Sequence, residues 1–185
     1  WVALRRGDTT AMAQGRLSLN PLRHIDPIGT VLVPALLAVF GGFIFGWAKP
    51  VPVDYHRLRQ PKRDMALVAL AGPGANLVMA LGWALAAAIG HGMQTNLLWL
   101  GEPLLLMGVA GVNVNVMLGV LNLVPIPPLD GSRALAGVLP DRFGLAMVRM
   151  EPYGLIVLVL LLVSGVLNLM PIVNSIRHFI LSLFF

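Results

Sequence analysis

Cysteine is absent from the 185 residues of this chain, and charged side chains are scarce. Without cysteine the chain can form neither a disulfide framework nor a thiolate metal site, so any metal must be bound by His, Asp or Glu. Charged residues make up 11% of the sequence and hydrophobic residues 57%, whereas a soluble domain usually carries about 25% charged residues. With a mean hydropathy of +0.82, the composition predicts an integral membrane protein.

Acidic residues are the scarcer charged class, with 8 Asp and Glu against 13 Lys and Arg and a net charge of +5. A basic excess is also a feature of nucleic-acid-binding proteins. Here, however, the basic residues lie in short segments that flank apolar stretches, which is the distribution that membrane topology requires. We therefore expect a lipid bilayer as a partner and no nucleic acid.

Three apolar segments are long enough to cross the hydrocarbon core, which takes about 20 residues of helix. They are residues 65–90, 103–124 and 153–170. No internal repeat and no loop long enough for an appended soluble domain is evident in the sequence. The predicted fold is an all-α polytopic membrane protein with short extended or β-like loops, forming a single membrane-embedded domain over residues 1–185.

A fourth apolar segment, residues 28–48, contains Pro34 and the pair Gly41-Gly42 and has basic residues on both sides. A simple crossing would place one basic cluster outside, against the positive-inside rule. A re-entrant or broken hairpin that turns at Gly41-Gly42 would instead keep Arg23 and Lys49 on the same side. Both possibilities stay open, and cysteine labelling at positions 23 and 49 from opposite sides of the membrane would demonstrate a full crossing.

The charge distribution predicts on which side of the membrane each remaining segment lies. Residues 1–27 form a basic, cytoplasmic loop region, and residues 125–152 carry three arginines and should also be cytoplasmic. The loop 91–102 has no Lys or Arg and should face outward. The tail 174–185 is apolar but too short to span, so we expect it to lie at the membrane interface.

The most informative stretch is N-L-V-P-I-P-P-L-D-G, residues 122–131, which follows the second predicted spanning helix. Proline lacks an amide donor and stops a helix, so we expect extended backbone here at the membrane boundary. A carboxylate at such a position, Asp130, is costly unless it is paired, solvated or bound to a cation. Two readings stay open: a turn in which Asp130 pairs with Arg133, or a metal ligand.

Three further motifs precede this stretch. A-G-P-G-A-N, residues 71–76, places small residues and Asn76 inside an apolar helix, which indicates either close helix packing or a functional amide. G-R-L-S-L-N-P-L-R-H-I-D-P-I-G, residues 15–29, places His24 and Asp26 on one face of an extended segment, where they could pair or contribute to a site. G-W-A-K-P-V-P-V, residues 46–53, suits a membrane interface.

In this order the four motifs resemble the site-2 protease family of membrane-embedded zinc metalloproteases, and specifically its compact bacterial branch. The resemblance covers nearly the whole chain. It implies a multi-pass protein of the bacterial inner or plasma membrane, with Zn²⁺ as cofactor and a transmembrane protein as substrate. It also implies that Asp130 is the third zinc ligand and that Asn122 assists substrate or oxyanion binding.

One departure from the family pattern concerns the other ligands. The resemblance implies two zinc-binding histidines and a general-base glutamate in an H-E-x-x-H motif, which the 185 residues do not contain. The four histidines, at positions 24, 56, 91 and 178, have no such spacing. The opening W-V-A-L-R-R-G-D resembles the segment directly after that motif in the family, so we expect a fragment that begins after the catalytic helix and is catalytically incomplete.

Two alternatives to the intramembrane zinc endopeptidase remain. One is a small transporter or channel, because broken helices with intramembrane Asn and Asp also mark transport sites; the lack of an inverted repeat argues against it. The other is a non-catalytic relative that binds membrane clients without cleaving them. An H-E-x-x-H motif upstream of Trp1 would favour the protease over both.

Overall fold

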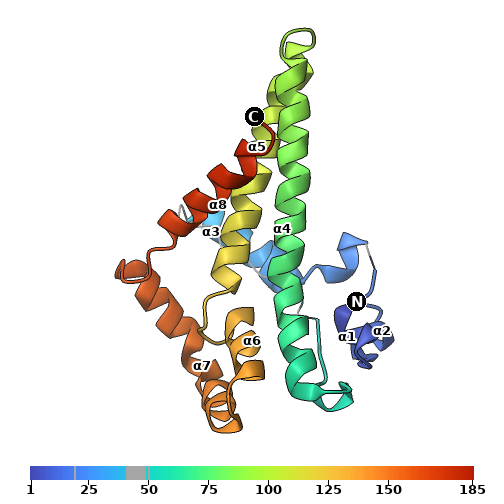
Figure 1. The fold of residues 1–185 in the computed structure, drawn as a ribbon, viewed down its shortest axis with the longest axis vertical. Helices are drawn as coiled ribbons and strands as arrows, with labels where there is room; N and C mark the ends of the chain where they lie inside the picture. Colours follow the sequence, from blue (N-terminus) through green and yellow to red (C-terminus); the bar gives the residue numbers. More distant parts are fainter. Residues whose placement is uncertain (19, 41–48, 50) are drawn as a thin grey trace. The chain divides into compact units, whose positions relative to one another are not determined.

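The computed structural model describes residues 1–18, 20–40, 49 and 51–185, with the side chains of residues 21, 141, 143, 145, 146 and 148 outside the description. The described residues form helices, turns and loops and no strand (Figure 1). The all-α prediction is therefore confirmed for them, whereas the expected β-like loops are not found there. The chain divides into two compact units, Trp1–Asp64 and Met65–Phe185. The single membrane-embedded domain stays a prediction.

Unit 1 consists of short helices joined by irregular loops. They are α1 (Val2–Arg5), α2 (Thr10–Ala13), the 3₁₀ helix η1 (Pro21–His24), the π-helix η2 (Pro27–Leu32), α3 (Val33–Val39) and the 3₁₀ helix η3 (Tyr55–Arg57). A polar side chain caps each η helix: Asn20 accepts from the amide of Leu22, Asp26 from two amides of η2, and Asp54 from His56. The sequence thus encodes these helix starts locally, in two cases with proline at the first helical position.

The first part of the segment 28–48 is helical. Helices η2 and α3 follow one another without a break over residues 27–39 and are apolar. Thirteen helical residues extend about 20 Å, which is less than the roughly 30 Å of a bilayer core. The proposed turn at Gly41-Gly42 and four of the eight residues of the motif 46–53 lie outside the described residues. The choice between a hairpin and a crossing therefore stays a prediction.

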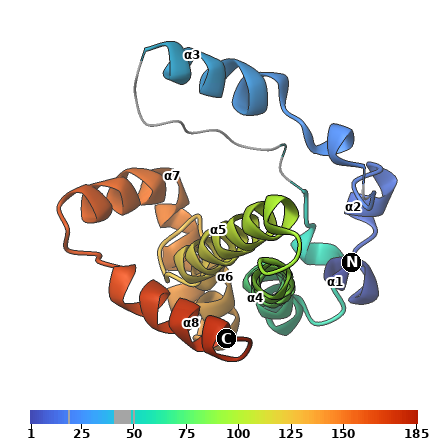
Figure 2. The same cartoon turned by 90° about the horizontal axis from the view of Figure 1, so that it is seen from above.

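Unit 2 is built on two long helices, α4 (Pro61–Met93, whose first turn belongs to unit 1) and α5 (Leu98–Asn122). Both views show them side by side (Figures 1 and 2). Among the described residues these are the two helices whose length and composition suit a membrane crossing. They correspond to the predicted spans 65–90 and 103–124.

The third predicted span, 153–170, is not confirmed. Helix α7 (Asp141–Val163) begins twelve residues earlier and ends seven residues earlier than expected. A turn follows in which Gly165 has φ +74°, and the chain then enters α8 (Met170–Ser182). Left-handed backbone of this kind favours glycine and ends a helix, so the serine–glycine pair within the apolar run divides it.

Small residues lie inside the α4–α5 pair and large apolar residues lie outside. Ala80, Ala84, Ala87 and Val112 have no exposed surface, and a Cβ added to Gly108 would lie 2.6 Å from the Cβ of Ala87. Large side chains on the same helices are instead exposed, for example Leu77, Val78, Leu85, Ile89, Leu106, Met107 and Val114. Helix pairs in lipid show this distribution, because close backbone approach rather than water exclusion holds them together.

Shorter helices complete unit 2. Helix α8 packs against α5, where Val173 and Ile180 join Val116 and Val120 in one buried cluster. Helix α6 (Asp130–Val138) packs against α7. The tail that we expected at the membrane interface is thus largely helical and docked on α5, while its position relative to a membrane remains a prediction.

Candidate functional site

The segment between α5 and α6 is a series of tight turns and not the extended backbone that we expected. The amide of Ile126 donates to the carbonyl of Val124 at 2.8 Å, and the amide of Leu129 donates to the carbonyl of Ile126 at 3.0 Å. The expectation of extended backbone was wrong because proline stops a helix but also suits turns. The non-proline amides here donate back along the chain.

Two glycines allow this turn segment to pack closely. A Cβ added to Gly131 would overlap the carbonyl of Leu123 and lie 2.6 Å from the carbonyl oxygen of Val124. A Cβ added to Gly154 of α7 would overlap the carbonyl of Pro127. The first turn of α6 therefore lies directly against the two residues that follow α5, and α7 covers the turn from another side.

Asp130 is the first residue of α6 and is half-buried. A helix N-terminus favours a carboxylate because the free amides there give it a partial positive charge. One carboxylate oxygen, Oδ2, lies 2.7 Å from the position that a Cβ at Gly72 would occupy, in the middle of the A-G-P-G-A-N motif of α4. The folded chain thus brings together two motifs that are 58 residues apart in the sequence (130 − 72).

Arg133 does not form the ion pair with Asp130 that one reading of the sequence required. Its Nη2 lies 3.0 Å from Oε1 of Glu151 on α7. Burial raises the pKa of the Asp130 carboxyl above its ordinary value, and the positive charge of Arg133 opposes this shift only in part. Within the described residues no hydrogen bond or ion pair of the Asp130 side chain occurs, which leaves its oxygens available for another partner.

A zinc ion would find one ligand here. Zinc binds carboxylate oxygen readily, and Asp130 fits that role because it is half-buried and its charge is not already paired. A catalytic zinc site usually takes three protein ligands. Within the part of the chain that the structure describes, no group of three His, Asp or Glu side chains is placed to bind a metal ion.

The two asparagines of the site lie on facing helices. Asn122 is the last residue of α5 and is half-buried. Asn76 of α4 is also half-buried, and its Cβ lies 3.6 Å from the Cβ position of Gly119 on α5. Asn76 therefore faces the α5 helix one turn before Asn122.

His24 and Asp26 belong to unit 1, and each makes its own local contact. Nε2 of His24 lies 2.9 Å from the carbonyl oxygen of Ser18. The Asp26 carboxylate caps η2 by accepting from the amides of Ile28 and Gly29. Among the described residues these two side chains do not pair with one another, and their contribution to a site stays a prediction.

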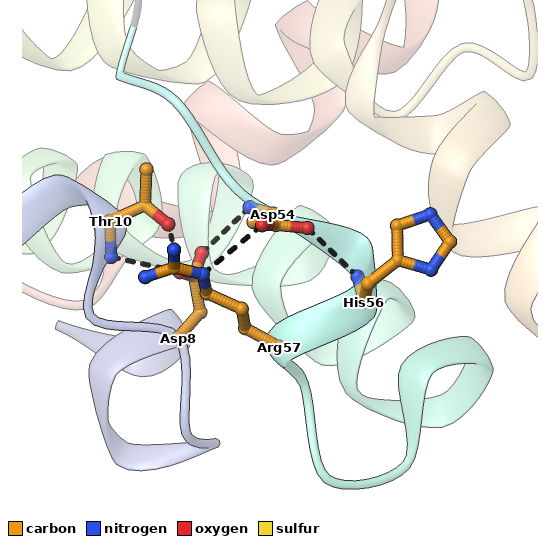
Figure 3. A network of polar contacts seen from close by, with 5 residues as sticks. All are labelled: Asp8, Thr10, Asp54, His56 and Arg57. Atoms are coloured by element: carbon orange, nitrogen blue, oxygen red, sulfur yellow. Dashed lines mark hydrogen bonds and ion pairs between the residues drawn. The ribbon is translucent and has the colours of Figure 1, made fainter.

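Unit 1 contains a polar network that was not evident from the sequence (Figure 3). Asp8, only 1% exposed, accepts hydrogen bonds from the amide and hydroxyl of Thr10 and, at 2.8 Å, from the amide of Asp54. Asp54 in turn pairs with Arg57 and caps η3, while the His56 ring points away from the network. Asp8 therefore fastens the start of the chain to the loop before α4. The signal in the sequence that could have indicated this network is the motif G-D-T-T, in which Asp8 stands two residues before Thr10 and can accept its hydrogen bonds.

A second missed feature is Gly72. Its motif in the sequence indicates close helix packing. The structure adds that the group next to Gly72 is the Asp130 carboxylate. Sequence alone offers no signal for this contact, because it depends on how the turn 123–129 folds back toward α4.

Two apolar helices of spanning length, followed by a half-buried and unpaired carboxylate, suggest a membrane protein with a candidate site at the end of α5.

Comparison with known proteins identifies its family. The chain is 38% identical over 199 aligned positions to the Bacillus subtilis protein named "Putative zinc metalloprotease YwhC", covering all of this chain and 82% of that protein. It is also 33% and 30% identical to the Mycolicibacterium smegmatis and Mycobacterium tuberculosis proteins named "Putative zinc metalloprotease Rip2", covering 91% of this chain and 61% of each of them.

The chain belongs to the site-2 protease family. This confirms the resemblance that the four motifs carried. The chain spans less than two thirds of the length of the Rip2 proteins. No family model and no solved structure matches the chain.

Proposed function

We propose that this chain is part of a zinc-dependent intramembrane endopeptidase of a bacterial cell membrane. Its substrate is a transmembrane protein, cleaved in or near a membrane-spanning segment, and the enzyme crosses the bilayer several times. The names of its relatives support a metalloprotease, and zinc as its metal. They also favour this proposal over the transporter or channel.

The observation that carries the proposal is that Asp130 is half-buried and has no ion-pair partner among the described residues. A half-buried carboxylate at the end of an apolar helix is costly, yet its neighbour Arg133 pairs with Glu151 instead. The N-terminus of α6 offsets part of this cost, and a bound cation would offset the rest. In the proposed site Asp130 contributes one zinc ligand, while the H-E-x-x-H histidines and glutamate that the family implies lie outside these 185 residues.

The residues of this chain have separate roles in the proposed reaction. Zinc, when bound, supplies Lewis-acid polarisation of the scissile carbonyl and lowers the pKa of a water molecule. Asp130 binds the metal and is fixed by the first turn of α6. Asn122, at the end of α5, donates an amide hydrogen to the substrate carbonyl oxygen and stabilises the negative charge that develops there.

The test uses a protein that carries this chain behind an H-E-x-x-H helix, purified in detergent. Asp130→Ala should remove bound zinc, measured by elemental analysis, and should abolish cleavage of a model transmembrane substrate. Asp130→Asn keeps the size of the side chain and removes its charge, so it should weaken zinc binding as well.

The matched control is Glu102→Ala, which removes an exposed carboxylate from the opposite end of α5. This variant should retain zinc and activity. If Asp130→Ala keeps both zinc and cleavage, the proposed role of Asp130 is wrong. Binding of a substrate helix without cleavage by the parent protein would instead support the client-binding alternative.

A further inference from the structure

Gly72 leaves space for the Asp130 carboxylate on the surface of α4. Among the described residues, the atoms that a Cβ at position 72 would approach within 4 Å all belong to the Asp130 side chain: Oδ2 at 2.7 Å and Cγ at 3.8 Å. A separation of 2.7 Å is too short for a carbon–oxygen contact, so any larger residue at position 72 must displace the carboxylate.

The type of neighbour decides what a substitution would do. At Gly131 and Gly154 the neighbouring atoms are backbone, which can move only if the fold moves. At Gly72 they are the end of a rotatable side chain. Alanine at position 72 should therefore be accommodated by rotation of Asp130, with the fold kept and the carboxylate relocated.

We infer that Gly72 is a positioning residue, which seats the Asp130 carboxylate against α4 in the orientation that the reaction needs. This inference rests on the proposed function for its catalytic consequence, but not for the contact itself. It gives the first glycine of A-G-P-G-A-N a role beyond helix packing. It also links α4 to the chemistry, although Gly72 itself has no side chain to offer.

Gly74, two residues further along α4, is a matched control. A Cβ added there meets none of the described atoms within 4 Å, and both glycines lie in the same helix beside Pro73. Alanine has a higher helix propensity than glycine at both positions, but position 72 also precedes Pro73, whose ring disfavours helical backbone for a residue that carries a Cβ. In the protein with an H-E-x-x-H helix, Gly72→Ala should lower zinc affinity and cleavage by about 10- to 100-fold, as loss of a residue that orients a ligand does. Gly74→Ala should match the parent in zinc affinity and cleavage and should melt no lower than the parent.

The contact can be measured without activity because the chain has no cysteine. Two cysteines form a disulfide only when their Cβ atoms lie about 3.5–4.5 Å apart. The Cβ position of Gly72 lies 3.8 Å from Cγ of Asp130 and more than 4 Å from its Cβ, towards the upper end of this range, so mild oxidation should cross-link Gly72→Cys with Asp130→Cys faster than Gly74→Cys with Asp130→Cys, as followed by mass spectrometry. Should Gly72→Ala fold poorly, adding Asp130→Ala should restore the part of its stability that the contact with that side chain removes.

The outcomes separate this inference from the proposed function. If Asp130→Ala is inactive but Gly72→Ala behaves as Gly74→Ala does, the positioning role is refuted and the protease stands. If Asp130→Ala cleaves normally, the proposed role of Asp130 in the reaction fails, and the cross-link then decides whether Gly72 seats the carboxylate. Equal cross-linking from positions 72 and 74 would overturn the inference in either case.

Discussion

Arg133 reaches Glu151 on α7, with 3.0 Å between Nη2 and Oε1, and leaves Asp130 on its own helix without an ion pair. The two partners are close to half exposed, at 46% and 43%. An exposed pair of this kind contributes up to about 1 kcal/mol to stability. Its larger consequence concerns Asp130, because residues three apart on a helix are neighbours and Arg133 is the nearest cation available to that carboxylate.

We therefore expect Glu151→Gln to have two effects. The free energy of unfolding should fall by no more than about 1 kcal/mol, and cleavage by the H-E-x-x-H-containing protein should fall several-fold as the released Arg133 pairs with Asp130. Adding Arg133→Gln should restore cleavage without restoring stability. A loss of activity that persists in the double variant would show that Glu151 acts in another way.

The parts of the fold that the sequence predicted are those governed by local pattern. The α4 and α5 helices follow from apolar length. The helices η1 and η2, which each begin with a capping side chain before proline, lie where we expected an extended segment with His24 and Asp26 on one face, so that expectation was wrong. What could not be predicted depends on contacts between distant segments. The turns at 123–129, the pairing of Arg133 with α7, and the meeting of Gly72 with Asp130 are all set by tertiary packing.

The third predicted span also shows the difference between what local pattern predicts and what tertiary packing decides. Apolarity continues through residues 153–170, and hydropathy alone does not distinguish one helix from two. The serine and glycine at positions 164 and 165 let the chain turn, and packing of α8 on α5 then stabilises the break. The candidate site followed from motif resemblance, whereas its geometry required the structure.

The buried carboxyl of Asp8 should make the stability of unit 1 depend on pH. Burial alone would raise the pKa of its carboxyl, but hydrogen bonds from Thr10 and Asp54 and the charge of Arg57 outweigh burial and lower the pKa. The unfolded value is about 3.9, so the stabilisation by Asp8 is present above that pH. It is lost as the pH falls below about 3.9 and through the lower pKa of the folded state.

Asp8→Asn should therefore destabilise unit 1 at neutral pH by about 1–3 kcal/mol, because the amide group cannot accept all three hydrogen bonds. It should also remove this part of the acid dependence. Hydrogen exchange of peptides covering residues 1–14 and 54–60, followed from pH 7 to pH 3, measures both effects. An equal response to acid in parent and variant would contradict the assignment.

Gly154 and Gly144 form a matched pair on α7. A Cβ at Gly154 would overlap the Pro127 carbonyl, whereas a Cβ at Gly144 would lie 3.6 Å from the nearest atom, an ordinary contact. We expect Gly154→Ala to cost about 1–3 kcal/mol through overpacking and to disturb the turn before Asp130. Gly144→Ala should instead add up to about 1 kcal/mol from helix propensity. Thermal unfolding in detergent tests this, and similar shifts in the two variants would mean that α7 does not pack on Pro127.

Alanine substitutions of the asparagines in α4 and α5 should distinguish a catalytic amide, whose loss lowers turnover, from structural amides, whose loss lowers stability. Asn115 is 8% exposed and donates to the carbonyl of Gly111 in its own helix at 2.8 Å, so Asn115→Ala should act on stability alone. Asn76 packs against Gly119 and should behave similarly. For Asn115→Ala we expect a loss of about 0.6 kcal/mol, the mean for hydrogen bonds within membranes, and for Asn76→Ala an effect through packing, with turnover retained in both.

Asn122 should differ, because it stands at the end of α5 where the turns leading to Asp130 begin. Removal of one donor to a developing oxyanion typically lowers turnover by about 100- to 1000-fold. In the protein with an H-E-x-x-H helix, Asn122→Ala should therefore keep its zinc and its melting temperature but lose most of its cleavage rate, with KM little changed. Asn115→Ala and Asn76→Ala, assayed alongside, control for the loss of an amide as such. If Asn122→Ala cleaves at the rate of these controls, its amide does not stabilise the transition state, and only a structural role at the end of α5 is left for it.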